Sequence, residues 1–421
     1  MVRTNKRIGI LVGGGPAPGI NSAISACVIA AADKGVDVIG IPDGFSRLIR
    51  GDIDRSFKLS PDDVELIHFK GGSILRTSRA NPTTRPENLE KTVKSLHSMN
   101  LESLISIGGE DTALSASEVA KASNGTIRVA HIPKTIDNDL PLPGDTPTFG
   151  YETARQLGTE LVSNLMEDSR TTNRWFIVVV MGRKAGHLAL GIGKGVGASL
   201  TIIPEEFSSS KIMLKDVVDV IAGSMLKRRV YGRDDGIVVI AEGVAEKIDP
   251  SELEQLAGLG IARDPHGHIR LGEIPVAAII RREVQKRFLE FGEELGMVDT
   301  TLGYELRCAP PIPFDIDYTP SLGFGAVQFL TTTTSEDSLR NGGLVYIENG
   351  MSKVMPFDDM RDSKTNKALV RVVDTKSHYY TVARKYMFRL EKEDLQDETM
   401  LDGLTKISSL GVGDYERMLK D

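Results

Sequence analysis

Short runs rich in valine and isoleucine recur along this chain of 421 residues, and most end in a glycine or a polar cluster. Examples are IGILV before GGGPAPG, LISI before GGED, IRVAHI before PKTIDND and FIVVV before MGRKAGH. Apolar runs that do not alternate with polar residues are typical of a parallel sheet covered on both faces. Helical patterns lie between the runs, as at 20–31, 62–69 and 88–100. This alternation predicts an α/β fold with right-handed crossover connections.

The length of the chain predicts two domains. Single hydrophobic cores stop growing beyond roughly 250–300 residues, and this chain is longer than that. The strand–helix series pauses at 141–150, where three prolines and two glycines indicate a crossing between domains. Residues 378–410 have the pattern of helices with charged faces, for which we expect packing or subunit contact.

Composition and charge narrow the class of protein. The chain is 40% hydrophobic and 26% charged, which is ordinary for a soluble globular protein. Its net charge of −7 argues against nonspecific binding to nucleic acid or to an anionic membrane, so an anionic ligand must be held by local cations and backbone N–H groups. The apolar runs at 8–12 and 175–181 are too short for a signal peptide or a membrane helix. We therefore expect a cytoplasmic protein with no nucleic-acid or membrane partner.

Cysteine and histidine give little sign of a metal site. The two cysteines, Cys27 and Cys308, form neither a disulfide framework nor a zinc spacing, and we expect reduced, partly buried thiols. His266 and His268 could form a metal pair, but no third ligand is visible, which favours a structural or surface role.

Two loops have the composition of an anion site. The glycine-rich stretch at 12–21 lacks the ending of a P-loop, and Pro18 stands where a dinucleotide fingerprint needs its third glycine. What remains is backbone that can approach a ligand closely, followed by a helix N-terminus, although a simple tight turn fits as well. The stretch at 71–82 adds Arg76 and Arg79, whose guanidinium groups suit phosphate oxygens or an ordinary surface loop.

Two further loops are acidic. Glu110 and Asp111 precede a helix that we expect to start near Thr112, so they either cap that helix or bind Mg²⁺. In PKTIDND, an extended backbone would place Thr135, Asp137 and Asp139 on one face. One carboxylate could then act as a general base and the other bind metal, with Lys134 contacting a phosphate; the alternative is a solvated turn. Because the glycine-rich stretch at 12–21 and these two acidic loops follow predicted strands, we expect several of them to meet at one crevice.

Seven sequence blocks together resemble the phosphofructokinase family. They run in family order from Gly13 to Asp315 and read GGGPAPGIN, GGSILRTSR, GGED, PKTIDND, MGRKAGH, IAEG and GYELR with the following P and FD. The resemblance implies phosphorylation of the 1-hydroxyl of fructose 6-phosphate, with Mg²⁺ as cofactor. It also implies two doubly wound, mostly parallel-sheet α/β domains with the active site in the cleft between them. The larger, donor-binding domain would be 1–148 plus 306–361, and the smaller, sugar-binding domain 149–305 plus 362–421.

The resemblance further implies a role for each matching residue. Asp137 would be the general base, and the catalytic group would comprise Asp137, Thr135, Lys134 and Arg183. The expected donor-binding residues are Gly15, Arg79, Gly109, Asp111 and Lys134. The expected substrate-binding residues are Thr135, Asp137, Arg174, Met181, Gly182, Arg183, Glu242, Tyr304 and Arg307. The expected metal ligands are Glu110 and Asp139. Arg174 would reach the active site of a neighbouring subunit, which implies a homodimer or homotetramer.

The donor is predicted from two positions. ATP-dependent members commonly have glycine where Asp111 and Lys134 stand here. A carboxylate at 111 would repel the α-phosphate of ATP by on the order of 4 kcal/mol at about 4 Å and an effective dielectric near 20. Lys134 supplies a cation for a small, highly charged donor. The pair resembles the pyrophosphate-dependent branch, which implies a reversible reaction; the alternatives are ATP as donor, or a non-catalytic regulatory subunit that binds phosphosugars.

Three positions depart from the family pattern. Glu110 and Pro16 each replace an aspartate, so direct metal binding by Glu110 stays open. Val298 stands where bacterial ATP-dependent relatives have a further arginine for the sugar phosphate. Arg281 or Arg282 could replace that arginine.

Overall fold

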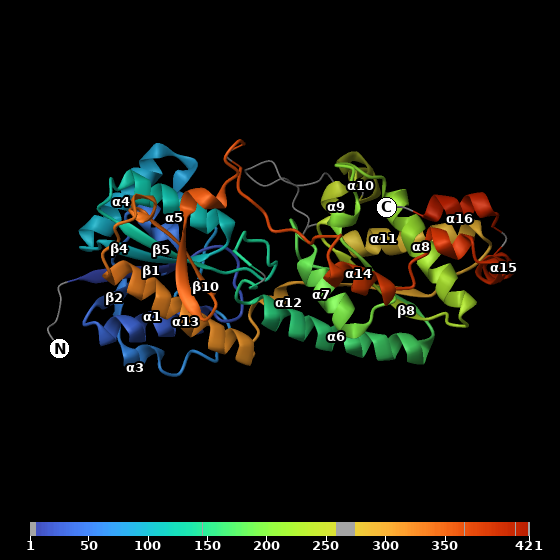
Figure 1. Ribbon diagram of the computed structural model, residues 1–421, viewed down its shortest axis with the longest axis horizontal. Coiled ribbons are helices and arrows are strands. Elements are labelled where there is room, and N and C mark those ends of the chain that lie inside the picture. Colours follow the sequence, from blue (N-terminus) through green and yellow to red (C-terminus); the bar gives the residue numbers. More distant parts are fainter. Residues whose placement is uncertain (1–5, 145, 258–273, 366, 409, 420–421) are drawn as a thin grey trace. The chain divides into compact units, whose positions relative to one another are not determined.

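A computed structural model describes residues 6–144, 146–257, 274–365, 367–408 and 410–419 (Figure 1). The chain forms two compact units. Unit 1 comprises residues 1–154 and 304–371, and unit 2 comprises residues 155–303 and 372–421. Across the described residues, no helix is both long and apolar enough to cross a membrane.

Unit 1 contains a seven-stranded sheet in the order β11-β10-β5-β4-β1-β2-β3. Its strands are β1 (Arg7–Val12), β2 (Asp37–Gly40), β3 (Phe57–Leu59), β4 (Ser103–Gly108), β5 (Arg128–Pro133), β10 (Gly342–Glu348) and β11 (Met351–Pro356). The five inner strands are parallel, and only β3 and β11 pair antiparallel at the two edges. This is the mostly parallel sheet that the continuous apolar runs predict.

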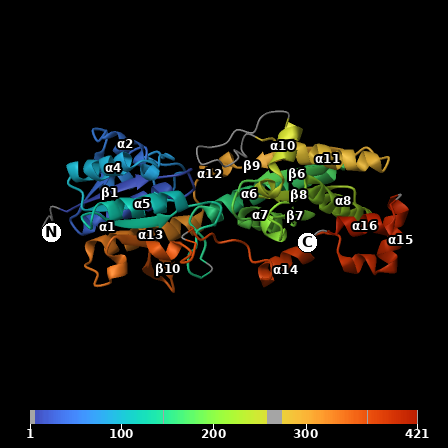
Figure 2. The same cartoon turned by 90° about the horizontal axis from the view of Figure 1, so that it is seen from above.

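Helices cover both faces of this sheet (Figures 1 and 2). One face packs against α1 (Ile20–Asp33), α3 (Pro61–Val64) and α13 (Pro313–Thr331). The other packs against α2 (Phe45–Arg50), α4 (Pro86–Ser98) and α5 (Glu110–Ala122). The remaining helices of the unit are α12 (Tyr304–Arg307) and the short 3₁₀ turns η1 (Pro82–Thr84), η4 (Asp337–Leu339) and η5 (Phe357–Met360).

Unit 2 contains a four-stranded, all-parallel sheet in the order β7-β8-β6-β9. The strands are β6 (Trp175–Val180), β7 (Leu200–Ile202), β8 (Gly236–Ala241) and β9 (Met297–Leu302). One face is covered by α8 (Leu214–Val230) and α11 (Val276–Glu290), and α15 (Glu398–Ile407) and α16 (Val412–Met418) pack on α8. Helix α7 (His187–Val196) lies against β6, β7 and β8, and α6 (Tyr151–Thr172), which begins in unit 1, packs on α7 where Gly158 meets Ile192. The other elements are α9 (Val244–Lys247), α10 (Pro250–Ala257), α14 (His378–Lys385), η2 (Pro204–Glu206) and η6 (Lys392–Leu395).

The expected helices are found with two changes. The helix predicted at 62–69 is only α3, because the N–H groups of Ile67 and Lys70 bond three residues back, to Val64 and Ile67, and close tight turns. The helix expected to start near Thr112 begins at Glu110. Cys27 is fully buried in α1, and burial raises the pKa of its thiol to about 12, whereas Cys308 is exposed. His266 and His268 lie outside the described residues.

Candidate active site

The loops after β1, β4 and β5 are neighbours at the carboxyl edge of the sheet in unit 1. The backbone N–H of Gly13 donates to the carbonyl of Ile107 at 2.9 Å, and that of Lys134 donates to Gly108 at 2.8 Å. Three of the predicted ligand loops therefore meet where ligands collect in open α/β sheets. The arginine loop joins them, since Gly14 N–H donates to Ser78 at 2.9 Å and the Thr77 hydroxyl donates to Gly14 at 2.6 Å.

Lys134 lies at the centre of this cluster. Its side chain is buried, with the residue only 4% exposed, and its ammonium donates to the carbonyl of Gly15. The pKa of Lys134 is lowered to about 8, first by burial and then by Arg307 and Arg79, while Asp137 and Asp139 oppose this shift. Because all four side chains affect the pKa of Lys134, the structure brings these predicted residues close to one ammonium group.

Arg307 extends from α12 over the glycine loop. A Cβ atom placed on Gly15 would lie 3.4 Å from Cζ of Arg307, so the guanidinium covers this glycine closely. The same Cζ lies 5.0 Å from the centre of the Tyr304 ring. Tyr304 itself is 74% exposed, which leaves its ring available to a ligand. Arg76, in contrast, is mostly exposed, and its Nη1 lies 3.9 Å from Asp43.

The first turn of α5 carries both acidic residues of GGED. Glu110 and Asp111 are in that turn, and Gly109, at the N-cap, has no side chain with which to cap it. The carboxylates therefore interact with the positive end of the helix dipole without acting as the N-cap. Thr112 follows and packs on both neighbouring loops, because a Cβ on Gly13 would lie 2.4 Å from its Oγ1 and one on Gly108 would lie 2.4 Å from its Cβ.

The PKTIDND loop is not extended, which corrects the alternation argument for Thr135, Asp137 and Asp139. Strand β5 ends at Pro133 and the chain bends at 136–137. Asn138 adopts a left-handed conformation with φ of 57°. The Asp137 N–H donates to Thr135 Oγ1 at 3.0 Å, so this hydroxyl is used within the turn.

Unit 2 brings together four of the residues expected at the sugar. Met181, Gly182 and Arg183 follow β6, and Glu242 follows β8. The N–H of Glu242 donates to Val180 at 2.8 Å, and that of Gly243 donates to Gly182 at 3.0 Å, so the two strand ends are joined. Gly182 has φ of 134°, a conformation that only glycine adopts readily.

Arg183 forms an ion pair within this second cluster. Its Nε lies 3.5 Å from Oε1 of Glu246, and both side chains are about one-third exposed. An exposed pair of this kind contributes little to stability. The guanidinium can therefore exchange its partner for a ligand phosphate at low cost.

Arg174 lies at the opposite end of β6 from Arg183. It precedes the first residue of the strand, whereas Met181 follows the last. A strand of this length separates the two by roughly 20 Å at 3.3 Å per residue, so Arg174 does not join the cluster of its own unit. Arg281 lies near the same amino edge, with Nε 2.6 Å from Asp299 beside Val298. Arg282 instead pairs with Glu283 at 3.6 Å.

Sequence reasoning missed two residues that shape the loops of unit 1. His131 in β5 is buried and links β5 to β4, with Nε2 donating to the Gly108 carbonyl at 3.0 Å and Nδ1 accepting from Ser106 at 2.9 Å. Burial lowers the pKa of this imidazole to about 3, so it stays neutral. Asn21 in α1 donates to Lys70 and Gly71 and accepts from Ile74, which holds the arginine loop. Asn21 was visible in the GGGPAPGIN block, whereas His131 was hidden in an apolar run.

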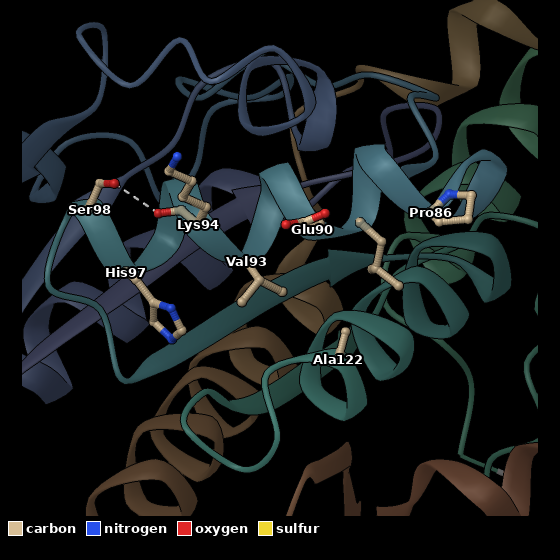
Figure 3. Close-up of a pocket in the computed structure, with 8 residues that line it drawn as sticks. Pro86, Glu90, Val93, Lys94, His97, Ser98 and Ala122 are labelled. Carbon is tan, nitrogen blue, oxygen red and sulfur yellow. Dashed lines mark hydrogen bonds between the residues drawn. The ribbon is translucent and has the colours of Figure 1, made fainter.

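A surface hollow lies elsewhere in unit 1 (Figure 3). It is bordered by α4 and the last residue of α5, and its lining includes Leu89, Val93, His97 and Ala122. None of the predicted site residues lines it. The hollow therefore has no part in the site built above.

The donor set in unit 1 fits a magnesium ion that binds together with a phosphate ligand. Among the described residues, no group of three or more His, Cys, Asp and Glu side chains could hold a metal alone. Mg²⁺ usually takes only one or two carboxylates, and substrate phosphates and waters complete its shell. Carboxylates at the ends of β4 and β5 beside a buried ammonium have that chemistry.

Comparison with known proteins identifies the family. A model of the family described as "Phosphofructokinase" matches residues 7–330. The chain belongs to the phosphofructokinase family. The resemblance found in the sequence is thereby confirmed, and so is the α/β fold, while the role of each residue in this phosphofructokinase stays a prediction.

Two relatives are similar over nearly their whole length. The pyrophosphate–fructose 6-phosphate 1-phosphotransferase of Thermotoga maritima is 57% identical over 396 residues, which are 94% of each chain. That of Naegleria fowleri is 46% identical over 420 residues, 98% of this chain and 95% of the relative. A solved phosphofructokinase of Saccharomyces cerevisiae has a TM-score of 0.67 at 21% identity, covering 98% of this chain and 49% of that one. This phosphofructokinase thus spans about half the length of the yeast chain, with which it shares the fold.

Proposed function

We propose that this phosphofructokinase catalyses the reversible transfer of a phosphoryl group from pyrophosphate to the 1-hydroxyl of fructose 6-phosphate. The products are fructose 1,6-bisphosphate and orthophosphate. The observation that carries the proposal is the buried ammonium of Lys134, held on the glycine loop and surrounded by Arg79, Arg307, Asp137 and Asp139. The names of the Thermotoga and Naegleria relatives support the same donor and acceptor.

Asp137 acts as the general base. Its carboxylate takes the proton from the sugar 1-hydroxyl while that oxygen attacks the nearer phosphorus of pyrophosphate. The bridging P–O bond breaks, and its electron pair leaves with orthophosphate. A positioned base contributes about 10²–10⁴-fold, and the rest of the catalysis is alignment and charge neutralisation.

The cations and the glycine loops hold the donor. Lys134 and Arg79 bind its phosphate oxygens, and the backbone of Gly15 and Gly109 allows close approach. Mg²⁺, held by Glu110 and Asp139, supplies further charge neutralisation when it is bound. Thr135 lies beside Asp137 and contacts the transferring group.

The proposed contacts of the sugar phosphate are those that the family resemblance implies. Tyr304 and Arg307 in unit 1, and Met181, Gly182, Arg183 and Glu242 in unit 2, are the proposed contacts. Arg174 reaches a neighbouring subunit of a homodimer or homotetramer, with Arg281 in place of the arginine missing at Val298. The division into a donor-binding and a sugar-binding domain and the cytoplasmic location stay predictions.

Asp111 excludes nucleotides. It is exposed in the first turn of α5, within the GGED stretch where the donor is expected to bind. Repulsion from its carboxylate disfavours the α-phosphate of ATP, whereas pyrophosphate has no third phosphate to place there. A non-catalytic regulatory subunit is less well supported, because Asp137, Asp139 and Arg183 are all present.

Turnover with each donor tests the proposal. The purified wild type should use pyrophosphate and not ATP, and Asp111→Gly should gain ATP-dependent turnover, further increased by adding Lys134→Gly. Glu118→Gln, an acid-to-neutral change later in α5, is the matched control and should leave donor choice unchanged. Wild-type preference for ATP would refute the donor assignment, and no turnover with any donor would favour the regulatory subunit.

A further inference from the structure

The backbone between the two key aspartates is held in an uncommon conformation. Asn138 lies between Asp137 and Asp139 and has φ of 57°. Asparagine tolerates this left-handed region better than most residues, but it does not select it alone. The side chain adds one restraint, since Oδ1 accepts from the Thr148 N–H at 3.0 Å.

Arg371 supplies further restraint. Its Nε donates to the carbonyl of Asn138 at 3.1 Å, its Nη2 donates to Oδ1 of the same residue, and its Nη1 donates to the carbonyl of Thr146 at 2.9 Å. Its own backbone N–H donates to the carbonyl of Asp139 at 2.8 Å. One half-buried residue thus binds both sides of the turn.

Arg371 is distant in sequence from the loop that it binds. It is the last residue of unit 1 and lies 233 positions from Asn138 in the sequence. No sequence block that pointed to the active site includes it. Its guanidinium is a planar donor with fixed geometry, so three bonds to the loop are made from one pre-organised group.

We infer that Arg371 is a positioning residue for phosphoryl transfer, which holds Asn138 in its left-handed conformation and thereby sets Asp137 and Asp139. The inference rests on the proposed function. Arg371 does not touch the substrate; it acts through the backbone that carries the base and the metal ligand. Lysine cannot replace it, because a single ammonium group cannot reach the three acceptors that the planar guanidinium group reaches.

Steady-state kinetics provide the first test. In Arg371→Lys and Arg371→Met, kcat with pyrophosphate should fall by about 10–100-fold, since a displacement near 1 Å can cost on the order of 10²-fold. The KM values for both substrates should change little. In Arg371→Ala, added guanidinium ion should restore part of kcat. Arg361→Met is the matched control, because Arg361 pairs with Glu118 at 3.5 Å in the same unit and should leave kcat unchanged.

Hydrogen–deuterium exchange gives a readout that does not depend on activity. In Arg371→Met, amides of residues 135–150 should exchange faster than in the wild type, while those of β1 and β4 keep their protection. If these amides exchange faster but kcat equals that of the wild type, Arg371 does not position the catalytic groups. If their exchange is unchanged, Arg371 does not hold the loop. If the wild type itself has no pyrophosphate turnover, the proposed function fails, whereas the exchange result still decides whether Arg371 holds the loop.

Discussion

At the scale of single residues, the site of this phosphofructokinase depends on charged side chains that lie close together. Burial and two arginines oppose the positive charge of Lys134, while two aspartates favour it. The balance leaves the pKa of Lys134 at about 8, within the range where pH can change its charge in the free enzyme. The two aspartates nearby have different proposed tasks, one as base and one as metal ligand.

The pH dependence of donor binding follows from Lys134. Its pKa is lowered from 10.5 to about 8, so the ammonium is charged below pH 8 and becomes neutral above it. The KM for pyrophosphate should therefore rise above pH 8, by up to about tenfold per pH unit if only the charged form binds. Lys134→Arg, which stays charged, should flatten the rise. A flat wild-type profile to pH 9.5 would contradict this prediction.

Replacing the base tests the role of Asp137. Asp137→Asn keeps the size of the side chain but cannot accept the proton, so kcat should fall by about 10²–10⁴-fold or more. Binding of fructose 6-phosphate, measured by calorimetry, should remain nearly intact. A kcat within threefold or so of the wild type would remove Asp137 from that role, because a general base contributes far more.

At the scale of elements, the site is formed by loops that pack against the first turn of α5. Thr112 occupies the space next to Gly13 and Gly108, so the absence of a side chain at either glycine is a packing requirement. The β1 and β4 loops are thereby brought up to the helix that carries Glu110 and Asp111. His131 donates to the Gly108 carbonyl and so also restrains the β4 loop.

Gly13→Ala should destabilise unit 1. The added Cβ would lie 2.4 Å from Oγ1 of Thr112. Such overpacking lowers the free energy of unfolding by about 1–3 kcal/mol. Thr112→Ala in the same chain should recover part of this loss, which a double-mutant cycle in urea would measure. Gly413→Ala is the control and should be neutral or slightly stabilising, because no atom of the described residues beyond the local helix backbone lies within 4 Å of the added Cβ. Additive losses in the cycle would contradict the packing argument.

At the scale of the whole molecule, the proposed reaction involves a second copy of the chain through Arg174. Arg174 and Arg183 occupy opposite ends of β6. One strand thus presents two cations to different sites if the subunits associate as proposed.

Mixing two variants of low activity tests whether Arg174 acts in the active site of the neighbouring subunit. Arg174→Ala and Asp137→Ala, each weak alone, should recover activity after their subunits are mixed, because one site in the mixed oligomer has both residues. For a randomly mixed dimer the recovery is about one quarter of the wild type. Mixing Asp137→Ala with Arg183→Ala should give no recovery, since both act within their own subunit. No recovery in the first mixture would place Arg174 outside the neighbouring site.

The sequence alone determined the fold class and the location of the ligand loops. Continuous apolar runs require a sheet covered on both faces, and ligand loops at the ends of parallel strands must share one edge. Motif blocks then identified the family, and glycine, arginine and carboxylate content identified a phosphate site. These features depend on residues close in sequence, which is why they could be predicted.

The way in which the loops are held depends on tertiary contacts. A shared face for Thr135, Asp137 and Asp139 needs an extended PKTIDND loop, but the loop turns at Asn138, where Thr148 binds it from ten residues away and Arg371 from 233 residues away. The low pKa of His131 and the intermediate pKa of Lys134 likewise result from burial, which no local pattern reveals. Restraints between residues distant in sequence arise only when the sheet and helices pack. The folded unit therefore sets the positions of the candidate catalytic groups, whereas the sequence shows only which groups are present.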